Sequence, residues 1–185
     1  MRLTLRAAVR VAAVVLPLCA FTPAGAQPST VIIVRHAEKA ATPGPDPALS
    51  DAGVERARAL AAAIDGARVE SVIATQYKRT SETAAPLLEA RGLQPITVPA
   101  TRDMAAHIKA VADAVRAQPA GATVLVVGHS NTVPAIVNAL GGPKMPDLCE
   151  SDYDNLFILH FDSGSVPRFV RARFGAPDDA PPNGC

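Results

Sequence analysis

The sequence Val31-Ile32-Ile33-Val34 is followed directly by Arg35-His36-Ala37-Glu38 and gives the clearest indication of the fold class. A continuous run of apolar, β-branched residues is typical of a strand that is buried on both faces of a sheet. Residues 123–127 are a second run of this kind, and they lead into Gly128-His129-Ser130. Because ligands bind at the carboxyl ends of the strands in open α/β sheets, the two segments predict a site at one sheet edge.

Strand and helix patterns alternate over the rest of the chain. The patterns predict strands at 31–34, 69–75, 94–98, 123–127, 155–161 and 166–174. They predict helices at about 51–64, 80–90, 103–118 and 131–140. This alternation is typical of a parallel sheet covered by helices, and the turn sequence at 162–165 predicts a hairpin between the last two strands. We therefore expect an α/β protein, a three-layer α/β/α sandwich with a mainly parallel sheet and antiparallel C-terminal strands.

Local signals set the expected helix ends and faces. Ser50 is a candidate cap for the first helix, whose buried face is predicted to carry Val54, Ala57, Ala61 and Ile64. Pro86 lies inside the second predicted helix and is expected to kink it or delay its start. Ser130 or Asn131 is expected to cap the fourth helix, and Pro134 is tolerable in its first turn.

The first 26 residues are predicted to be a secretory signal peptide. Three arginines in the first ten residues precede an apolar core at 11–21, and Ala24-Gly25-Ala26 is a small-x-small cleavage pattern. The core is too short for a membrane span, which needs about 20 apolar residues. Cleavage leaves a single expected domain at 27–185, periplasmic or secreted, with no stable membrane anchor.

Charge and cysteine content narrow the expected partners and compartment. The formal net charge of +1 is too small to indicate nucleic-acid binding. Cys149 and Cys185 remain after the expected cleavage, and two thiols in an oxidising compartment often pair. We expect a bridge between them, with two free thiols as the alternative.

A third polar segment follows the second predicted strand. Arg79 stands just before the expected N-terminus of the 80–90 helix, a location that favours anions. A guanidinium there can bind phosphate oxygens with two parallel hydrogen bonds. Taken alone, Arg79 is equally an exposed arginine beside helix caps, and His36 or His129 is equally a hydrogen-bonded structural histidine.

Together the segments carry a resemblance. Arg35-His36-Ala37-Glu38, then Arg79-Thr80 before Thr83-Ala84, then Gly128-His129-Ser130 resemble the histidine phosphatase superfamily, the phosphoglycerate mutase-like group. The likeness covers about residues 30–174. The chain has no large inserted cap, and in this it is similar to the small phosphohistidine phosphatases. It implies that His36 becomes phosphorylated and that Arg35, Arg79 and His129 complete a phosphate pocket.

The chemistry of these groups agrees with that implication. Two guanidiniums can neutralise and orient a phosphate of charge about −2. A neutral His36 can then attack phosphorus, and a protonated His129 would add positive charge where the transferring oxygens need it. We therefore expect a metal-independent phosphatase for phosphomonoesters or phosphohistidine, acting on a small phosphorylated substrate. The scattered histidines show no metal-ligand spacing, so neither a metal nor another cofactor is expected.

The group that exchanges a proton with the leaving oxygen is less determined. The candidates are Glu38, Glu82, Asp103 and Glu150. Asp103 follows the third predicted strand, roughly where the family often places its acid, but a helix N-terminal charge explains it equally well. An enzyme without a firm acid would favour substrates with good leaving groups.

Other readings remain open. A phosphotransferase or mutase of the same fold, and a non-catalytic phospholigand-binding module, are the two alternatives. Lys39 is either part of a basic rim or a solvated loop residue, and we interpret His107 and His160 as structural. Substrate specificity is expected in the segments 40–48, 99–104 and 142–154, which carry no recognisable code, and the sequence does not indicate an oligomeric state.

Overall fold

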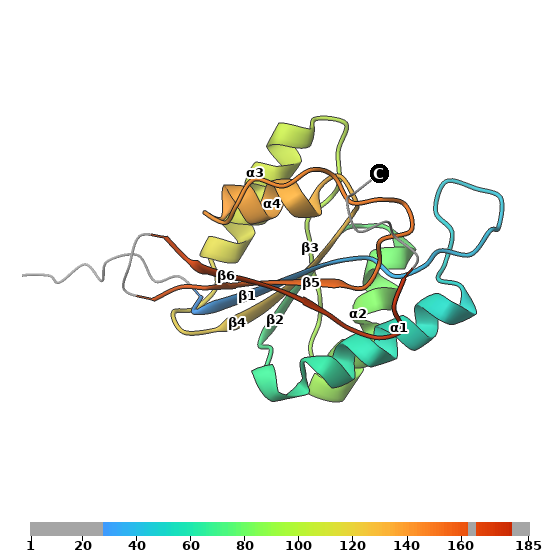
Figure 1. Ribbon diagram of the computed structural model, residues 1–185, viewed down its shortest axis with the longest axis horizontal. Coiled ribbons are helices and arrows are strands. Elements are labelled where there is room, and N and C mark those ends of the chain that lie inside the picture. Colours follow the sequence, from blue (N-terminus) through green and yellow to red (C-terminus); the bar gives the residue numbers. More distant parts are fainter. Residues whose placement is uncertain (1–27, 163–165, 179–185) are drawn as a thin grey trace, which may run out of the picture.

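The computed structural model describes residues 28–162 and 166–178. Six strands form one sheet in the order β3-β2-β4-β1-β5-β6 (Figure 1). The strands are β1 (Thr30–Arg35), β2 (Ser71–Ala74), β3 (Ile96–Thr97), β4 (Thr123–Gly128), β5 (Asn155–His160) and β6 (Arg168–Arg173). The helices are α1 (Asp51–Ala63), α2 (Lys78–Arg91), α3 (Met104–Arg116) and α4 (Val133–Ala139), with a short 3-10 turn at Asp65–Ala67.

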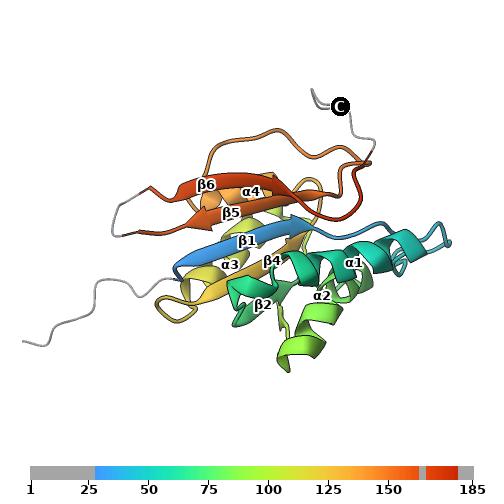
Figure 2. The same cartoon turned by 60° about the horizontal axis from the view of Figure 1, so that its bottom comes forward.

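The direction of the strands matches the sequence-based expectation. β1, β2, β3 and β4 pair in parallel, whereas β5 runs antiparallel to β1 and β6 antiparallel to β5. Helices α1 and α2 cover one face of the sheet and α3 and α4 cover the other (Figure 2). The expected three-layer α/β/α sandwich is therefore confirmed.

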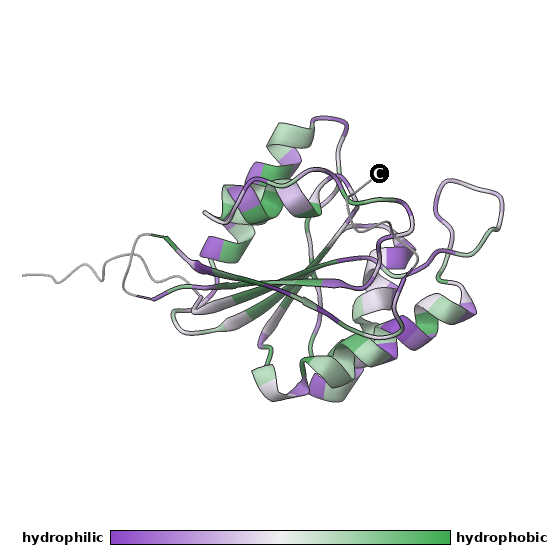
Figure 3. Cartoon of the chain, in the orientation of Figure 1, coloured by the Kyte–Doolittle hydropathy of each residue, from purple (hydrophilic) through white to green (hydrophobic). Residues whose placement is uncertain are grey.

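The central strand β1 separates two apolar cores. Val31 and Ile33 pack with the α3 and α4 side chains, and Ile32 and Val34 pack with those of α1 and α2. Successive side chains of a strand point to opposite faces, so an unbroken apolar run fills both layers at once. Figure 3 shows the hydrophobic colouring concentrated along the central strands and on the inner sides of the helices. This core fixes the two strands whose ends carry the polar motifs.

The buried face of α1 agrees with the predicted one at Ala57, and Ile64 directly after the helix is buried as predicted, but the face as a whole is rotated. Its buried residues are Gly53, Arg56, Ala57 and Leu60, whereas Val54 is 38% exposed. Gly53 causes part of this rotation, because a Cβ atom there would lie 2.2 Å from the backbone oxygen of Glu38. Arg56 points inward to an ion pair with Glu38, so a charged residue occupies a position that a purely apolar pattern does not predict.

The ends of two helices also differ from expectation. α2 starts at Lys78, two residues earlier than predicted, and continues through Pro86, so the proline neither delays nor ends it. The residue at the N-cap of α4 is Thr132 and not Ser130 or Asn131. The Ser50 cap on α1, which accepts a hydrogen bond from the Gly53 N–H at 3.2 Å, is confirmed, as is Pro134 in the first turn of α4.

Several expectations lie outside the described residues. These are the signal peptide at 1–26, the tip of the hairpin at 163–165, and Cys185. Cys149 is disulfide-bonded. Within residues 28–162 and 166–178, no helix has both the length and the apolar character needed to cross a membrane.

Candidate active site

Two histidines follow neighbouring strands at the same edge of the sheet. In the pairing of β1 with β4, Arg35 is the register partner of Gly128, and the His36 N–H donates to the Gly128 carbonyl at 2.9 Å. His36 and His129 are therefore the next residues on two parallel strands. Their ring centres lie 5.4 Å apart with an angle of 64° between the planes. The predicted convergence of the two imidazoles is thus set by the register of the sheet.

The His36 ring has a defined tautomer. Its Nδ1 lies 2.8 Å from the carbonyl oxygen of Ala37, and because a carbonyl only accepts, Nδ1 carries the proton. The lone pair of the neutral ring is therefore on Nε2. Burial lowers the pKa of His36 from 6.5 to about 3, and the charges of Arg35 and Arg79 also act to lower it. At neutral pH the ring is therefore uncharged, with an unprotonated Nε2.

His129 is held from two sides. Its backbone N–H donates to Oγ1 of Thr132 at 2.9 Å, and its Nε2 lies 3.2 Å from Oγ1 of Thr75. Burial lowers the pKa of His129 to about 3, and His36 and Arg79 also act to lower it. In the free protein His129 is therefore neutral, whereas the chemistry expected from the sequence uses a protonated His129. A bound dianion would raise its pKa, because an opposite charge nearby favours the charged form.

Arg35 is enclosed by residues 149–153, which we call the clamp loop. Its Nη1 donates to the carbonyl oxygens of Cys149 at 2.5 Å and Asp152 at 3.3 Å. Its Nη2 lies 3.2 Å from a carboxylate oxygen of Glu150, and its guanidinium carbon is 4.1 Å from the centre of the Tyr153 ring. With a side chain that is 2% exposed, Arg35 has its position fixed mainly by this loop.

Arg79 comes from the first turn of α2. Its guanidinium carbon lies 4.2 Å from the centre of the Tyr77 ring, whose centre is 5.6 Å from that of His129. Asp46, from the loop before α1, lies 3.8 Å from Nη1. Each of the two arginines is therefore stacked on a tyrosine, an arrangement that orients the planar guanidinium.

One cavity of about 430 Å³ unites these groups. It is lined by Arg35, His36, Lys39, Tyr77, Arg79, Ala100, Thr101, Met104, His107, His129, Ser130, Asn131, Thr132 and Glu150. All four residues predicted to bind phosphate are in this set. The cavity therefore offers two guanidiniums, one ammonium and the neutral imidazoles of His36 and His129 to a single anion, and Glu150 is its one lining carboxylate within the described part of the chain.

Comparisons with known proteins agree with this geometry. Residues 31–106 match the family model of the histidine phosphatase superfamily, branch 1. A structure of the protein histidine phosphatase SixA with tungstate aligns at a TM-score of 0.60 and 18% identity, covering 78% of this chain and 96% of SixA. The chain has the histidine phosphatase fold. The family match covers residues 31–106, and the solved neighbours share the fold of the whole described domain.

Two further solved structures share the fold. SixA from Agrobacterium tumefaciens aligns at a TM-score of 0.57 and 24% identity, covering 81% of this chain and 99% of SixA. A mycobacterial glucosyl-3-phosphoglycerate phosphatase in complex with inorganic phosphate aligns at a TM-score of 0.59 and 18% identity. The alignment covers 80% of this chain and 97% of that phosphatase. No curated protein matches the chain significantly. The phosphoglycerate mutase-like fold expected from the motifs is thus confirmed.

Within this fold, the four candidate carboxylates have different surroundings. Glu38 pairs with Arg56, and Glu82 accepts a hydrogen bond from the Leu49 N–H at 2.7 Å. Asp103 is exposed and caps α3 by accepting from the Ala106 N–H at 3.0 Å. Glu150 alone of the four lines the cavity, where it lies 3.6 Å from the ammonium of Lys39. The structure therefore gives Asp103 a capping contact, and its acid role stays a prediction.

The remaining sequence candidates are also placed. Lys39 lines the cavity rim, with a side chain that is 47% exposed. His107, which we expected to be structural, is buried on α3, where its Nδ1–H donates to the Pro99 carbonyl at 3.0 Å, and it also lines the cavity. His160 lies at the exposed end of β5, 3.0 Å from Asp162.

The two tyrosines and the clamp loop were not predicted from the sequence. Tyr77 precedes Arg79 by two residues, a spacing that could have suggested stacking. Tyr153 lies 118 residues after Arg35 in a segment without helix or strand, so no local pattern links them. Near this loop, one group of three carboxylates has oxygens within 4.8 Å of one another, namely Asp152, Asp154 and Asp178.

Proposed function

We propose that the protein is a metal-independent phosphatase of the histidine phosphatase superfamily that works through a phosphohistidine on His36. The observation that carries this proposal is that His36, with its lone pair on Nε2, lines the same cavity as Arg35, Arg79 and His129. The two guanidiniums neutralise a phosphate dianion without a metal ion. The family match over residues 31–106 supports the same assignment.

The first step transfers the phosphoryl group. Nε2 of His36 attacks phosphorus, the new P–N bond forms, and the bond from phosphorus to the ester oxygen breaks with its electron pair leaving on that oxygen. Arg35 and Arg79 hold the non-reacting oxygens in place, which removes much of the entropic cost of alignment. The hydrogen bond from Nδ1 to the Ala37 carbonyl stabilises the ring as it becomes positively charged.

The second step returns the free enzyme. A water molecule attacks phosphorus, the P–N bond breaks, and its electron pair returns to Nε2 of His36. The water loses a proton, and the carboxylate of Glu150, which lies in the cavity wall beside Arg35 and Lys39, is the candidate to accept it. The same carboxylate is engaged by both cations, so we do not assign it the donation of a proton in the first step.

The lack of an assigned proton donor for the first step indicates the class of substrate. Without a carboxylic acid at the leaving oxygen, substrates whose leaving group needs no protonation are expected to react fastest. Aryl phosphates and phosphohistidine belong to this class, because their leaving groups carry the developing charge better than an alkyl alcohol does. We propose phosphorylated compounds of this kind as substrates and expect slower turnover of alkyl phosphates.

We further propose that the protein acts outside the cytoplasm, in the periplasm or as a secreted enzyme. The N-terminal pattern at 1–26 supports export. The disulfide of Cys149 supports an oxidising compartment, since thiols stay reduced in the cytosol. Cell fractionation with an epitope at the C-terminus tests this, and recovery of uncleaved protein in the cytosol would contradict it.

The catalytic proposal is tested with p-nitrophenyl phosphate and the secreted form of the chain. We expect turnover to be lost in His36→Ala and kept in His160→Ala, a matched control at the exposed end of β5. Acid-labile and alkali-stable incorporation of radiolabelled phosphate should occur in the wild type and not in His36→Ala. Transfer to an added alcohol in preference to water would instead favour a phosphotransferase, and binding without turnover would favour a phospholigand-binding module.

A further inference from the structure

We propose that the C-terminal segment 174–178 is a strap that positions Arg35 for phosphate binding, with Asp178 as the positioning residue. The inference rests on the proposed function only in assigning phosphate to the cavity. It concerns a part of the chain that none of the sequence motifs includes. Three sets of contacts, from Arg35 to the clamp loop, from the loop to Asp178, and from the strap to α1, carry it.

The first contacts join Arg35 to the backbone of the clamp loop. Two of its hydrogen bonds go to main-chain oxygens, those of Cys149 and Asp152. The path of the loop backbone, and not only its side chains, therefore sets where the guanidinium lies. Stacking of Tyr153 over the guanidinium depends on the same path. A shift of the loop would move the guanidinium relative to His36.

The clamp loop has little regular structure of its own. Residues 149–153 belong to no helix or strand, and their one main-chain hydrogen bond to each other runs from the Asp152 N–H to the Cys149 carbonyl at 3.0 Å. A loop of this kind depends on contacts from outside to keep one conformation. Asp178 supplies such contacts: its Oδ2 accepts from the N–H groups of Tyr153 at 2.7 Å and Asp154 at 3.0 Å.

Asp178 holds its position among other acidic groups. Its carboxylate lies with those of Asp152 and Asp154, with oxygens within 4.8 Å of one another. Like charges this close repel, and burial together with Asp178 raises the pKa of Asp152. Arg173 offsets part of the repulsion by binding Asp154 at 2.6 Å, with Asp178 at 3.8 Å. The two N–H groups favour a carboxylate oxygen at residue 178 despite the neighbouring charges.

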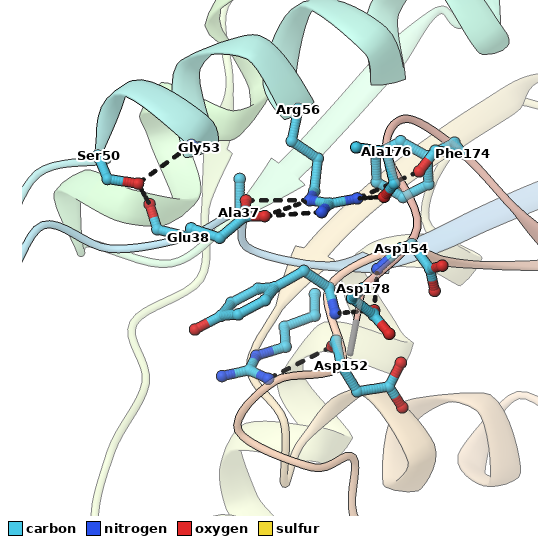
Figure 4. A network of polar contacts seen from close by, with 12 residues as sticks. Ala37, Glu38, Ser50, Gly53, Arg56, Asp152, Asp154, Phe174, Ala176 and Asp178 are labelled. Carbon is cyan, nitrogen blue, oxygen red and sulfur yellow. Dashed lines mark hydrogen bonds and ion pairs between the residues drawn. The ribbon is translucent and has the colours of Figure 1, made fainter. Parts of the chain in front are cut away.

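The strap is also held by a residue of α1. Arg56 of α1 donates to the carbonyl oxygens of Phe174 at 3.2 Å and Ala176 at 2.9 Å. The same guanidinium binds Glu38, whose carboxylate oxygens lie 2.8 and 2.9 Å from Nε. Figure 4 shows Arg56 between Glu38 and the strap, with Asp178 beside Asp154. The strap therefore links the segment that carries His36 to the loop that holds Arg35.

The test measures phosphate affinity separately from stability. In Asp178→Ala, we expect the dissociation constant of inorganic phosphate, measured by calorimetry, to rise about tenfold, since two charge-assisted hydrogen bonds to the loop are lost. Asp178→Asn keeps an oxygen that can accept both N–H groups and should stay within about twofold of the wild type, because it also removes like-charge repulsion. Asp162→Ala, which removes an exposed acid at the far end of β5, is the matched control.

Several outcomes decide the proposal. Equal phosphate affinity in the wild type and Asp178→Ala, or a drop in thermal stability alone, overturns it. Should Asp178→Ala not fold, Asp178→Ser, whose hydroxyl is too short to reach both N–H groups, replaces it under the same criterion. Calorimetry needs no turnover, so a protein that binds phosphate without hydrolysing esters would overturn the proposed activity and leave the strap testable.

Discussion

The imidazole rings of His36 and His129 lie edge to face, with centres 5.4 Å apart, at the ends of two adjacent parallel strands. A positive charge on either ring disfavours a charge on the other, and both rings are buried among arginines. Burial lowers both pKa values from 6.5 to about 3. The free site therefore contains two neutral imidazoles, and positive charge in it comes from Arg35, Arg79 and Lys39.

These pKa values predict how stability depends on pH. In the unfolded chain each imidazole takes up a proton as the pH falls through 6.5, whereas in the folded protein it does so only near 3. The unfolded state thus binds more protons, and the folded state should lose about 1.4 kcal/mol per pH unit for each ring below pH 6.5. Urea unfolding measured between about pH 7 and about pH 5, above the usual carboxylate range, checks this slope.

Asparagine variants supply the control. His36→Asn and His129→Asn should each reduce the slope by roughly one proton's contribution, and the double variant should flatten most of it. A double variant with the wild-type slope would show that other groups cause the pH dependence.

Replacing Arg79 with lysine should weaken phosphate binding although the charge is kept. A lysine has no planar group to stack on Tyr77, and its ammonium cannot form two parallel hydrogen bonds to phosphate. We therefore expect the dissociation constant of vanadate to rise by about tenfold or more. Arg58→Lys, an exposed substitution on α1, should have no effect. Similar vanadate affinities in Arg79→Lys and the wild type would remove Arg79 from the anion site.

Glu38 should matter for stability more than an exposed glutamate of the same region does. Its partner Arg56 is 5% exposed, and removing one member of a buried ion pair costs about 3 kcal/mol because the other charge stays buried. Glu38→Ala is therefore expected to lower the free energy of unfolding by about this amount. Glu55→Ala breaks the exposed pair with Arg58 and should cost no more than about 1 kcal/mol. Equal losses would contradict the structural role of the Glu38–Arg56 pair.

Removing the charge of Glu150 should strengthen product inhibition. Its carboxylate lies 3.2 Å from the Arg35 guanidinium, where it would compete with a bound phosphate. In Glu150→Gln we expect the inhibition constant of inorganic phosphate to fall severalfold, about threefold or more, while the release of phosphate from His36 slows. Rapid-quench measurement of the phosphoenzyme checks the second effect. An unchanged inhibition constant would show that Glu150 does not compete with the anion.

Asp103 should act through helix capping. Asp103→Ala loses the hydrogen bond to the Ala106 N–H, which should lower the free energy of unfolding by about 1 kcal/mol. Turnover of an alkyl phosphate should fall by less than about tenfold, since a general acid is worth more than that. A larger loss in kcat, at unchanged folding, would restore Asp103 to the acid role.

The central sheet could be predicted from the sequence because its inner strands must be buried on both faces. Residues 31–34 and 123–127 are apolar at consecutive positions, which requires cover on both faces, and the polar motif after each strand then falls at the same edge. The structure brings Arg35, His36, Arg79 and His129 to one cavity as expected. Their catalytic roles remain predictions.

Other features depend on contacts that no local pattern encodes. The rotation of α1 follows from a close approach between Gly53 and Glu38 and from an inward-pointing arginine. Periodicity alone therefore placed Ala57 and Ile64 correctly but put Val54 on the buried face. The enclosure of Arg35 depends on a loop more than a hundred residues away in the chain. Such long-range contacts involve backbone oxygens, which every residue has, and so leave no signature in residue type.

The pairing of Arg35 with Gly128 also bears on how the protein can change in evolution. Since side chains alternate across a strand, inserting or deleting one residue in β1 or β4 would turn the following imidazole to the opposite layer and separate the two rings. The segments 40–48 and 142–148 carry no such constraint on spacing, and they can vary in length while the paired histidines stay in place. New substrate preferences are therefore expected to arise by exchange of these outer segments on an unaltered pair of strands.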